Sequence, residues 1–120
     1  MRYDGGCYQG SCFARPGFAN CQTFAYAVLR YFGRTIPNFR SSELWTDTTH
    51  TFVVDQFEPL DLILFNRSSD GFAAHVGICI KSGAVLHLSR RVGTPAIWDL
   101  ATFAAIPAYA VVVGAKRTLK

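Results

Sequence analysis

Residues 18–33 read FANCQTFAYAVLRYFG, and their spacing predicts one helix. Apolar residues recur three and four positions apart, as on a single buried helical face. They are Cys21, Phe24, Ala25, Val28, Leu29 and Phe32. Asn20 is a favourable N-cap, and Gly33 is a favourable residue just beyond the last turn. The helix is therefore expected to begin at Cys21 and to end before Gly33.

Cys21 stands at the first position of this helix, and two interpretations of it are open. Unpaired N–H groups and the positive end of the helix dipole favour a thiolate there, and the thiolate is the nucleophilic form of cysteine. Cysteine is also one of the most buried residue types, so Cys21 is equally well explained as the first apolar residue of a core helix. The helix alone does not decide between these interpretations.

The composition indicates one compact domain over residues 1–120. Half of the 120 residues are hydrophobic and 17% are charged, and 10 Phe, 5 Tyr and 2 Trp supply bulk for a small core. The net charge of +4 is mild, and the basic residues are mostly scattered. Nucleic-acid binding is therefore not expected, and we expect a monomer.

The sequence also bears on location. Its first residues, MRYDGG, lack the apolar stretch of a secretory signal, and no run approaches the length of a membrane span. As encoded, the chain is expected in the cytoplasm. Export by another route, or origin as a piece of a longer protein, stays open.

Cysteine and histidine spacing does not indicate a metal site. Cysteines occur at positions 7, 12, 21 and 79 and histidines at 50, 75 and 87, without paired metal-ligand spacing. We expect no metal and no cofactor. Cys7 and Cys12 are expected as free thiols in the cytosol and as a possible disulfide in an oxidising compartment.

The remaining pattern predicts an irregular arm over residues 3–19 and then a helix-first α+β fold. After the helix we expect a short helix or turn at 41–47, a short strand or helix at 51–54, strands at 60–66, 74–80 and 84–89, a helix at 98–106 and a last strand at 108–115. This order favours a mostly antiparallel sheet with the helix packed on one face. Asp61 is expected as a turn or cap residue.

The strand predicted at 74–80 carries the second half of the candidate chemistry. Alternation places His75, Gly77 and Cys79 on one face, and the apolar residues Val76, Ile78 and Ile80 on the other. An apolar face opposite a histidine and a glycine is what the wall of a site needs.

The turn that follows decides the side on which His87 lies. A two-residue loop places His87 opposite Ile78, away from His75. A three-residue loop over 81–83, with Gly83 in the left-handed conformation, places His87 opposite Gly77. We favour the three-residue loop, which makes His75 and His87 a base and its orienting partner.

Five segments, in chain order, carry a resemblance to a known family. They are YDGG at 3–6, NCQTF at 20–24, EPLDLILF at 58–65, HVGI at 75–78 and VLH at 85–87. Together they resemble the NlpC-type cysteine peptidases of bacterial cell-wall turnover. The resemblance implies a papain-like α+β fold in which an N-terminal helix carries the nucleophile. It implies Cys21 as nucleophile, His75 as general base and His87 as the residue that orients His75.

The resemblance also implies an oxyanion hole built from the backbone N–H of Cys21 with help from the hydroxyl of Tyr3. Asn20 and Gln22 flank the nucleophile and are expected to contribute to substrate or oxyanion binding. The family commonly has Asp-Cys-Ser-Gly here, where the Asp and Ser help to hold the free amine of a wall peptide. This chain has Asn20-Cys21-Gln22-Thr23, which lacks that carboxylate.

The expected function is that of a thiol-dependent amide or peptide-bond hydrolase with a Cys-His-His triad. Its expected substrate is a peptide of the bacterial cell wall, the peptidoglycan. Two alternatives stay open. One is a toxin-like deamidase or acyltransferase on the same scaffold, and the other is a non-catalytic papain-like binding domain.

Overall fold

The computed structural model describes residues 2–3 and 18–119. Most of the predicted irregular arm, including Cys7 and Cys12, lies outside the described residues. The two ends of the arm are strands rather than irregular, so the prediction was wrong there: β1 (Arg2–Tyr3) and β2 (Phe18–Ala19) pair in parallel. This pairing brings Tyr3 level with Ala19, next to the start of the first helix.

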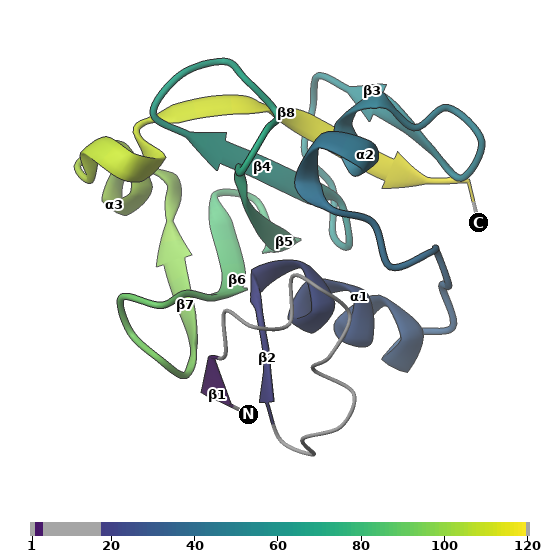
Figure 1. Cartoon of the computed structure of the whole chain (residues 1–120), viewed down its shortest axis with the longest axis horizontal. Helices are drawn as coiled ribbons and strands as arrows, with labels where there is room; N and C mark the ends of the chain where they lie inside the picture. The colour runs from purple at the N-terminus through teal and green to yellow at the C-terminus, as the bar shows by residue number, and fades with distance from the viewer. Residues whose placement is uncertain (1, 4–17, 120) are drawn as a thin grey trace.

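The remaining elements are a six-stranded sheet and the helices that pack on its two faces (Figure 1). The helices are α1 (Cys21–Tyr31), α2 (Ser41–Thr46), α3 (Leu100–Ala104) and the 3-10 helix η3 (Pro107–Tyr109). The strands are β3 (Thr51–Val54), β4 (Leu62–Asn66), β5 (His75–Lys81), β6 (Ala84–Leu88), β7 (Pro95–Asp99) and β8 (Val111–Thr118).

The sheet runs in the order β3-β8-β4-β5-β6-β7, and all its neighbouring pairs are antiparallel. Strands β4 to β7 follow one another as a meander, and β8 returns to lie between β3 and β4. Helix α1 packs against β5 and β6. The α+β class and the helix on one sheet face are thus as the sequence predicts.

Helix α1 begins and ends where its capping residues predict. Asn20 Oδ1 accepts from the backbone N–H of Thr23 at 2.8 Å, and the N–H of Asn20 donates to Thr23 Oγ1 at 2.9 Å. This reciprocal box satisfies two donors at the helix start. Gly33, with φ +81°, follows the last turn in the left-handed conformation.

The buried face of α1 differs in part from the predicted one. Cys21, Phe24, Ala25 and Leu29 are buried, but Phe32 is 58% exposed. Phe32 is the C-cap, at the end of the helix, so the prediction that it is buried was wrong. Gln22 and Tyr26 are buried instead, because they share the face of Ala25 and Leu29 at helical spacing.

The core lies on both faces of the sheet. One cluster joins α1 to the alternate residues Leu62, Leu64, Val76 and Ile78 of β4 and β5. A second cluster lies on the opposite face and joins Ile63, Phe65, Cys79, Val85 and Ala115 to Phe103 of α3. Strand β4 is therefore covered on both sides, which explains its unbroken apolar run.

The C-terminal third departs from the predicted elements. A helix was predicted over 98–106, but Trp98 and Asp99 are the last two residues of strand β7, and Asp99 also caps the five-residue α3 by accepting from the N–H of Thr102. Pairing with β6 places Trp98 beside Val85 in the sheet, and this tertiary contact overrides the local pattern. The last strand begins three residues later than predicted, because η3 precedes it.

The β5–β6 hairpin combines features of both predicted turns. Lys81 pairs with Ala84, so the loop has two residues and the favoured three-residue loop was wrong. A β-bulge between Cys79 and Lys81 inserts one extra residue, and Ile78 therefore pairs with Leu86. The extra residue of the bulge compensates for the shorter loop. His87 therefore lies beside Gly77 on the face of His75, as it would with a three-residue loop.

Gly77→Ala is predicted to destabilise the protein by about 1–3 kcal/mol, because an added Cβ would overpack a buried strand pair. That Cβ would lie 2.4 Å from Val85 Cγ1 and 3.5 Å from the Cβ of His87. The matched control is Gly83→Asn, because Gly83 has φ +76° with open space around it and asparagine tolerates this conformation. Urea denaturation measures both variants, and an equal loss in the two would contradict this account of the hairpin.

Candidate active site

Cys21 lies at the start of α1 and is 2% exposed. The side chain of Asn20 is occupied by the capping box, so it holds the helix start rather than reaching the cavity beside Cys21. The helix start directs its first N–H groups and the positive end of the dipole towards the region of the thiol. The predicted position of Cys21 at the helix tip is therefore observed.

A cavity of about 270 Å³ brings Cys21 together with His75 and Tyr3. These three residues come from α1, β5 and β1, which are distant in sequence. The cavity is also lined by Asn66, Arg67, Ala73, Ala74, Arg90, Ala108 and Tyr109. The candidate nucleophile, the candidate base and the candidate oxyanion donor thus border one cavity.

The two histidines form a direct hydrogen bond. His75 Nε2 lies 2.8 Å from His87 Nδ1, and the two rings are nearly perpendicular at 86°. Both residues are buried, with exposed fractions of 8% for His75 and 1% for His87. The structure therefore brings His75 and His87 together on one face, as predicted, and the hydrogen bond fixes the two rings relative to each other.

Aromatic side chains surround the histidine pair on the sheet face opposite α1. Tyr109 of η3 stacks on His75 with ring centroids 4.6 Å apart, and Trp98 meets the ring of His87 at 4.3 Å. Phe103 lies 4.7 Å from the His87 ring. These residues were not predicted as part of the site, although the density of aromatic residues in the segment 98–109 was a usable signal.

Burial keeps the histidine pair neutral at pH 7. Burial and, as a smaller cause, the neighbouring His87 lower the pKa of His75 to about 3. Burial also lowers the pKa of His87 to about 4. A neutral imidazole is the form that accepts a proton from a thiol.

The shared hydrogen bond couples the tautomers of the two rings. When His75 Nε2 carries the proton and donates it to His87 Nδ1, the Nδ1 of His75 has a lone pair and is a base. His87 then carries its own proton on Nε2. In the described part of the chain this buried Nε2 has no hydrogen-bond partner, so the pair is held at a cost in stability.

Tyr3 is fixed at the cavity by its backbone. Its N–H donates to the carbonyl of Gly93 at 2.9 Å, and its ring packs with the apolar cluster of Ala19, Phe24 and Leu88. The guanidinium of Arg90 lies 5.8 Å from the centre of the Tyr3 ring, within the range of a cation–π contact. Tyr3 thus borders the cavity as the resemblance predicts.

Gln22 does not line the cavity of Cys21. It lines a second cavity of about 250 Å³, which shares Ala73 with the first. Gln22 is 2% exposed, and within the described residues neither its Nε2 nor its Oε1 has a hydrogen-bond partner.

Asp61 is fully buried away from the cavity. Its carboxylate accepts from Arg117 Nε at 2.8 Å and Nη2 at 2.9 Å, and from the N–H of Glu58 at 2.8 Å. It therefore caps a turn, as predicted, and pairs with an arginine.

The described residues contain no group of three or more His, Cys, Asp or Glu side chains arranged to hold a metal ion. Within this same part of the chain, every helix is too short or too polar to cross a membrane.

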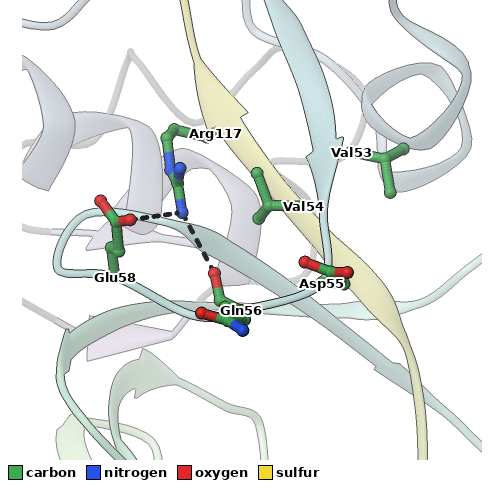
Figure 2. A pocket seen from close by; sticks show the side chains of 6 residues that line it. All are labelled: Val53, Val54, Asp55, Gln56, Glu58 and Arg117. Atoms are coloured by element: carbon green, nitrogen blue, oxygen red, sulfur yellow. Dashed lines mark hydrogen bonds and ion pairs between the residues drawn. The ribbon is translucent and has the colours of Figure 1, made fainter.

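A larger cavity of about 490 Å³ lies at β3 and β8, where β3 is an edge strand of the sheet (Figure 2). Figure 2 shows Arg117 reaching both Glu58, at 3.4 Å, and the carbonyl of Gln56, at 3.1 Å. The residues that line this cavity include no cysteine, serine or histidine. Arg117 pairs with Glu58 there, and the lining offers no thiol, hydroxyl or imidazole group.

The fold is similar to that of a known protein. A crystal structure of an NlpC/P60 family protein from Bacillus cereus ATCC 10987 superposes with a TM-score of 0.61 and 27% sequence identity over 83% of this chain. The chain spans 32% of the length of that protein. No protein-family model matches the sequence, and no curated protein is similar to it. The similarity supports an NlpC/P60-like α+β fold.

The buried histidines predict a pH-dependent stability. Unfolded histidine titrates near pH 6.5, so between that value and the folded pKa values of about 3 and about 4 the unfolded chain binds more protons. The contribution of the two histidines to the free energy of unfolding is therefore complete above about pH 6.5. On acidification the free energy of unfolding falls by up to about 1.4 kcal/mol per pH unit for each histidine. Urea denaturation between pH 4.5 and 7.5 measures this slope.

His87→Asn is the matched variant, because asparagine does not titrate. This variant is expected to reduce the slope of the free energy of unfolding against pH by roughly the contribution of one histidine. Asp47, whose pKa is lowered to about 2, is not expected to contribute in this range. Equal slopes in the wild type and the variant would show that His87 is not buried as a neutral ring.

Proposed function

We propose that this chain is a thiol-dependent hydrolase of amide bonds, with Cys21 as nucleophile, His75 as general base and His87 as the group that orients His75. The observation that carries the proposal is the 2.8 Å bond between His75 Nε2 and His87 Nδ1, at a cavity that also contains Cys21. A nucleophile, a base and a group that orients the base are the three parts of such a centre. We further propose that α1 and the sheet have the papain-like arrangement.

Acylation begins with proton transfer. The Nε2 of His75 is engaged with His87, so Nδ1 is the nitrogen that accepts the proton of the Cys21 thiol. The sulfur attacks the substrate carbonyl, a C–S bond forms, and the carbonyl electrons move to oxygen. Collapse of this intermediate breaks the C–N bond, and His75 gives its proton to the leaving amine.

The oxyanion requires hydrogen-bond donors during this step. We propose the backbone N–H of Cys21 and the hydroxyl of Tyr3, because both residues border the same cavity. Donors already in place before the reaction are worth several kcal/mol in an acyl transfer.

Deacylation reverses the roles. His75 accepts a proton from water, whose oxygen attacks the thioester carbonyl. The C–S bond breaks, the acid departs, and the proton on His75 returns to the sulfur. The aromatic side chains around the histidine pair limit the access of other water to the base.

The proposed substrate is a peptide of the bacterial cell wall. The similarity to an NlpC/P60 family protein supports this class, since the chain shares that fold over 83% of its length. Deamidation or acyl transfer would use the same thioester intermediate. Mass spectrometry of a trapped Cys21 adduct would identify the acyl group and so distinguish these reactions.

Cys21→Ala is predicted to abolish the cleavage of purified wall peptides, and His75→Gln to reduce it at least about 10²-fold, because glutamine cannot accept the thiol proton. Mass spectrometry of the products measures the cleavage. Melting temperatures near the wild-type value would show that the fold persists. Cleavage by Cys21→Ala would refute the proposed nucleophile.

His87 is predicted to act through a hydrogen bond, and a matched pair of variants tests this. His87→Asn offers an oxygen that can accept from His75 Nε2, and is expected to retain activity within about tenfold. His87→Leu offers no acceptor and is expected to lose about 10²-fold or more. Similar activity in the two variants would argue against an orienting role.

Thiol reactivity separates an enzyme from a non-catalytic binding domain. Burial, with the nearby Asp61, raises the pKa of Cys79, whose Sγ donates to the carbonyl of Lys81 at 3.3 Å. Iodoacetamide is therefore expected to label Cys21 at least about tenfold faster than Cys79, since the thiolate is the reactive form. Peptide mapping gives both rates, and equal rates would favour the binding domain.

A further inference from the structure

The second cavity adjoins the candidate active site. Its residue Gln22 follows Cys21 directly in the chain, and Ala73 borders both cavities. The second cavity is lined by Gln22, Arg40, Ser41, Ser42, Phe72 and Ala73. The second cavity can therefore hold the part of a substrate that adjoins the part bound at Cys21.

The side-chain amide of Gln22 is buried without a partner in this cavity. Its Nε2 donor and its Oε1 acceptor are both unsatisfied among the described residues, and the residue is 2% exposed. Buried polar groups nearly always have hydrogen-bond partners, and an unsatisfied one lowers stability. A ligand that satisfies both atoms must offer one acceptor and one donor, as another amide does.

The charges around the two cavities exclude a cationic group. Arginines border them at positions 40, 67 and 90, and none of the described lining residues is an aspartate or a glutamate. The side-chain oxygen of Asn20 is also occupied, because it accepts from the N–H of Thr23. A protonated amine would find positive charge here and no carboxylate.

We propose that the second cavity is a subsite for a neutral amide unit of the substrate, which pairs with the amide of Gln22. The inference rests on the proposed function of the adjoining thiol site. It makes the enzyme one that prefers peptides with an amide group at this position over peptides that offer only a free amino terminus there. The amide comes either from the peptide backbone or from a carboxamide side chain.

Three wall-type peptides test the proposal. The first has a free amino terminus, the second is the same peptide with its terminus acetylated, and the third has a free terminus with glutamine as its first residue. The Cys21→Ala protein binds them without turnover, and calorimetry gives the affinities. We expect the acetylated peptide to bind at least tenfold more tightly than the free one. A gain only for the glutamine peptide would support the side-chain source.

Variants of Gln22 identify the group responsible. Gln22→Leu, made in the Cys21→Ala protein, is expected to abolish the preference and to leave the melting temperature unchanged or higher, because no hydrogen bond is lost. Gln22→Glu is expected to shift the preference at least tenfold towards the free amine. The matched control is Gln56→Leu, at the cavity of Figure 2, which should retain the wild-type preference.

Turnover by the protein with Cys21 intact separates the two proposals. Cleavage without any preference that depends on Gln22 would overturn the subsite and leave the hydrolase. A binding preference that depends on Gln22, without cleavage of any peptide, would overturn the hydrolase and leave the subsite. Equal binding of all three peptides, or tighter binding of the free amine, would also overturn the subsite.

Discussion

The hydrogen bond between His75 and His87 is the constraint on which the candidate site depends. It holds the ring of His75 through Nε2 beside the cavity that Cys21 also lines, and the proposed mechanism uses Nδ1 for proton transfer. Several features of the fold serve this bond. The bulge in β5 sets the register, Gly77 removes a side chain beside His87, and the aromatic residues of β7, α3 and η3 bury both rings.

Burial has two consequences that oppose each other. It keeps the rings neutral, the form that can accept a proton, and it leaves His87 Nε2 without a partner among the described residues, which lowers stability. The side-chain amide of Gln22, at the neighbouring cavity, is likewise buried without a hydrogen-bond partner among the described residues. Polar groups that weaken the fold are thus concentrated beside the thiol, as is common where structure serves binding or chemistry.

Local signals predicted part of this structure. Asn20 and Gly33 gave the limits of α1, because capping depends on neighbouring residues alone. The face of His87 was predicted correctly from the wrong turn. A bulge and a third loop residue each add one residue between the paired parts of the two strands, so both place His87 on the same face of the sheet. Trp98 was assigned to a helix, because its pairing with β6 is a long-range contact that local periodicity does not contain.

Nitrogen-15 NMR of the imidazole rings tests the central claim most directly, because it reports which nitrogen carries the proton. The account predicts that His75 is neutral at pH 6, with its proton on Nε2 and a lone pair on Nδ1, and that His87 carries its proton on Nε2. A charged His75 at pH 6, or a His75 with its proton on Nδ1, would contradict the proposal that this ring is held ready as the base for Cys21.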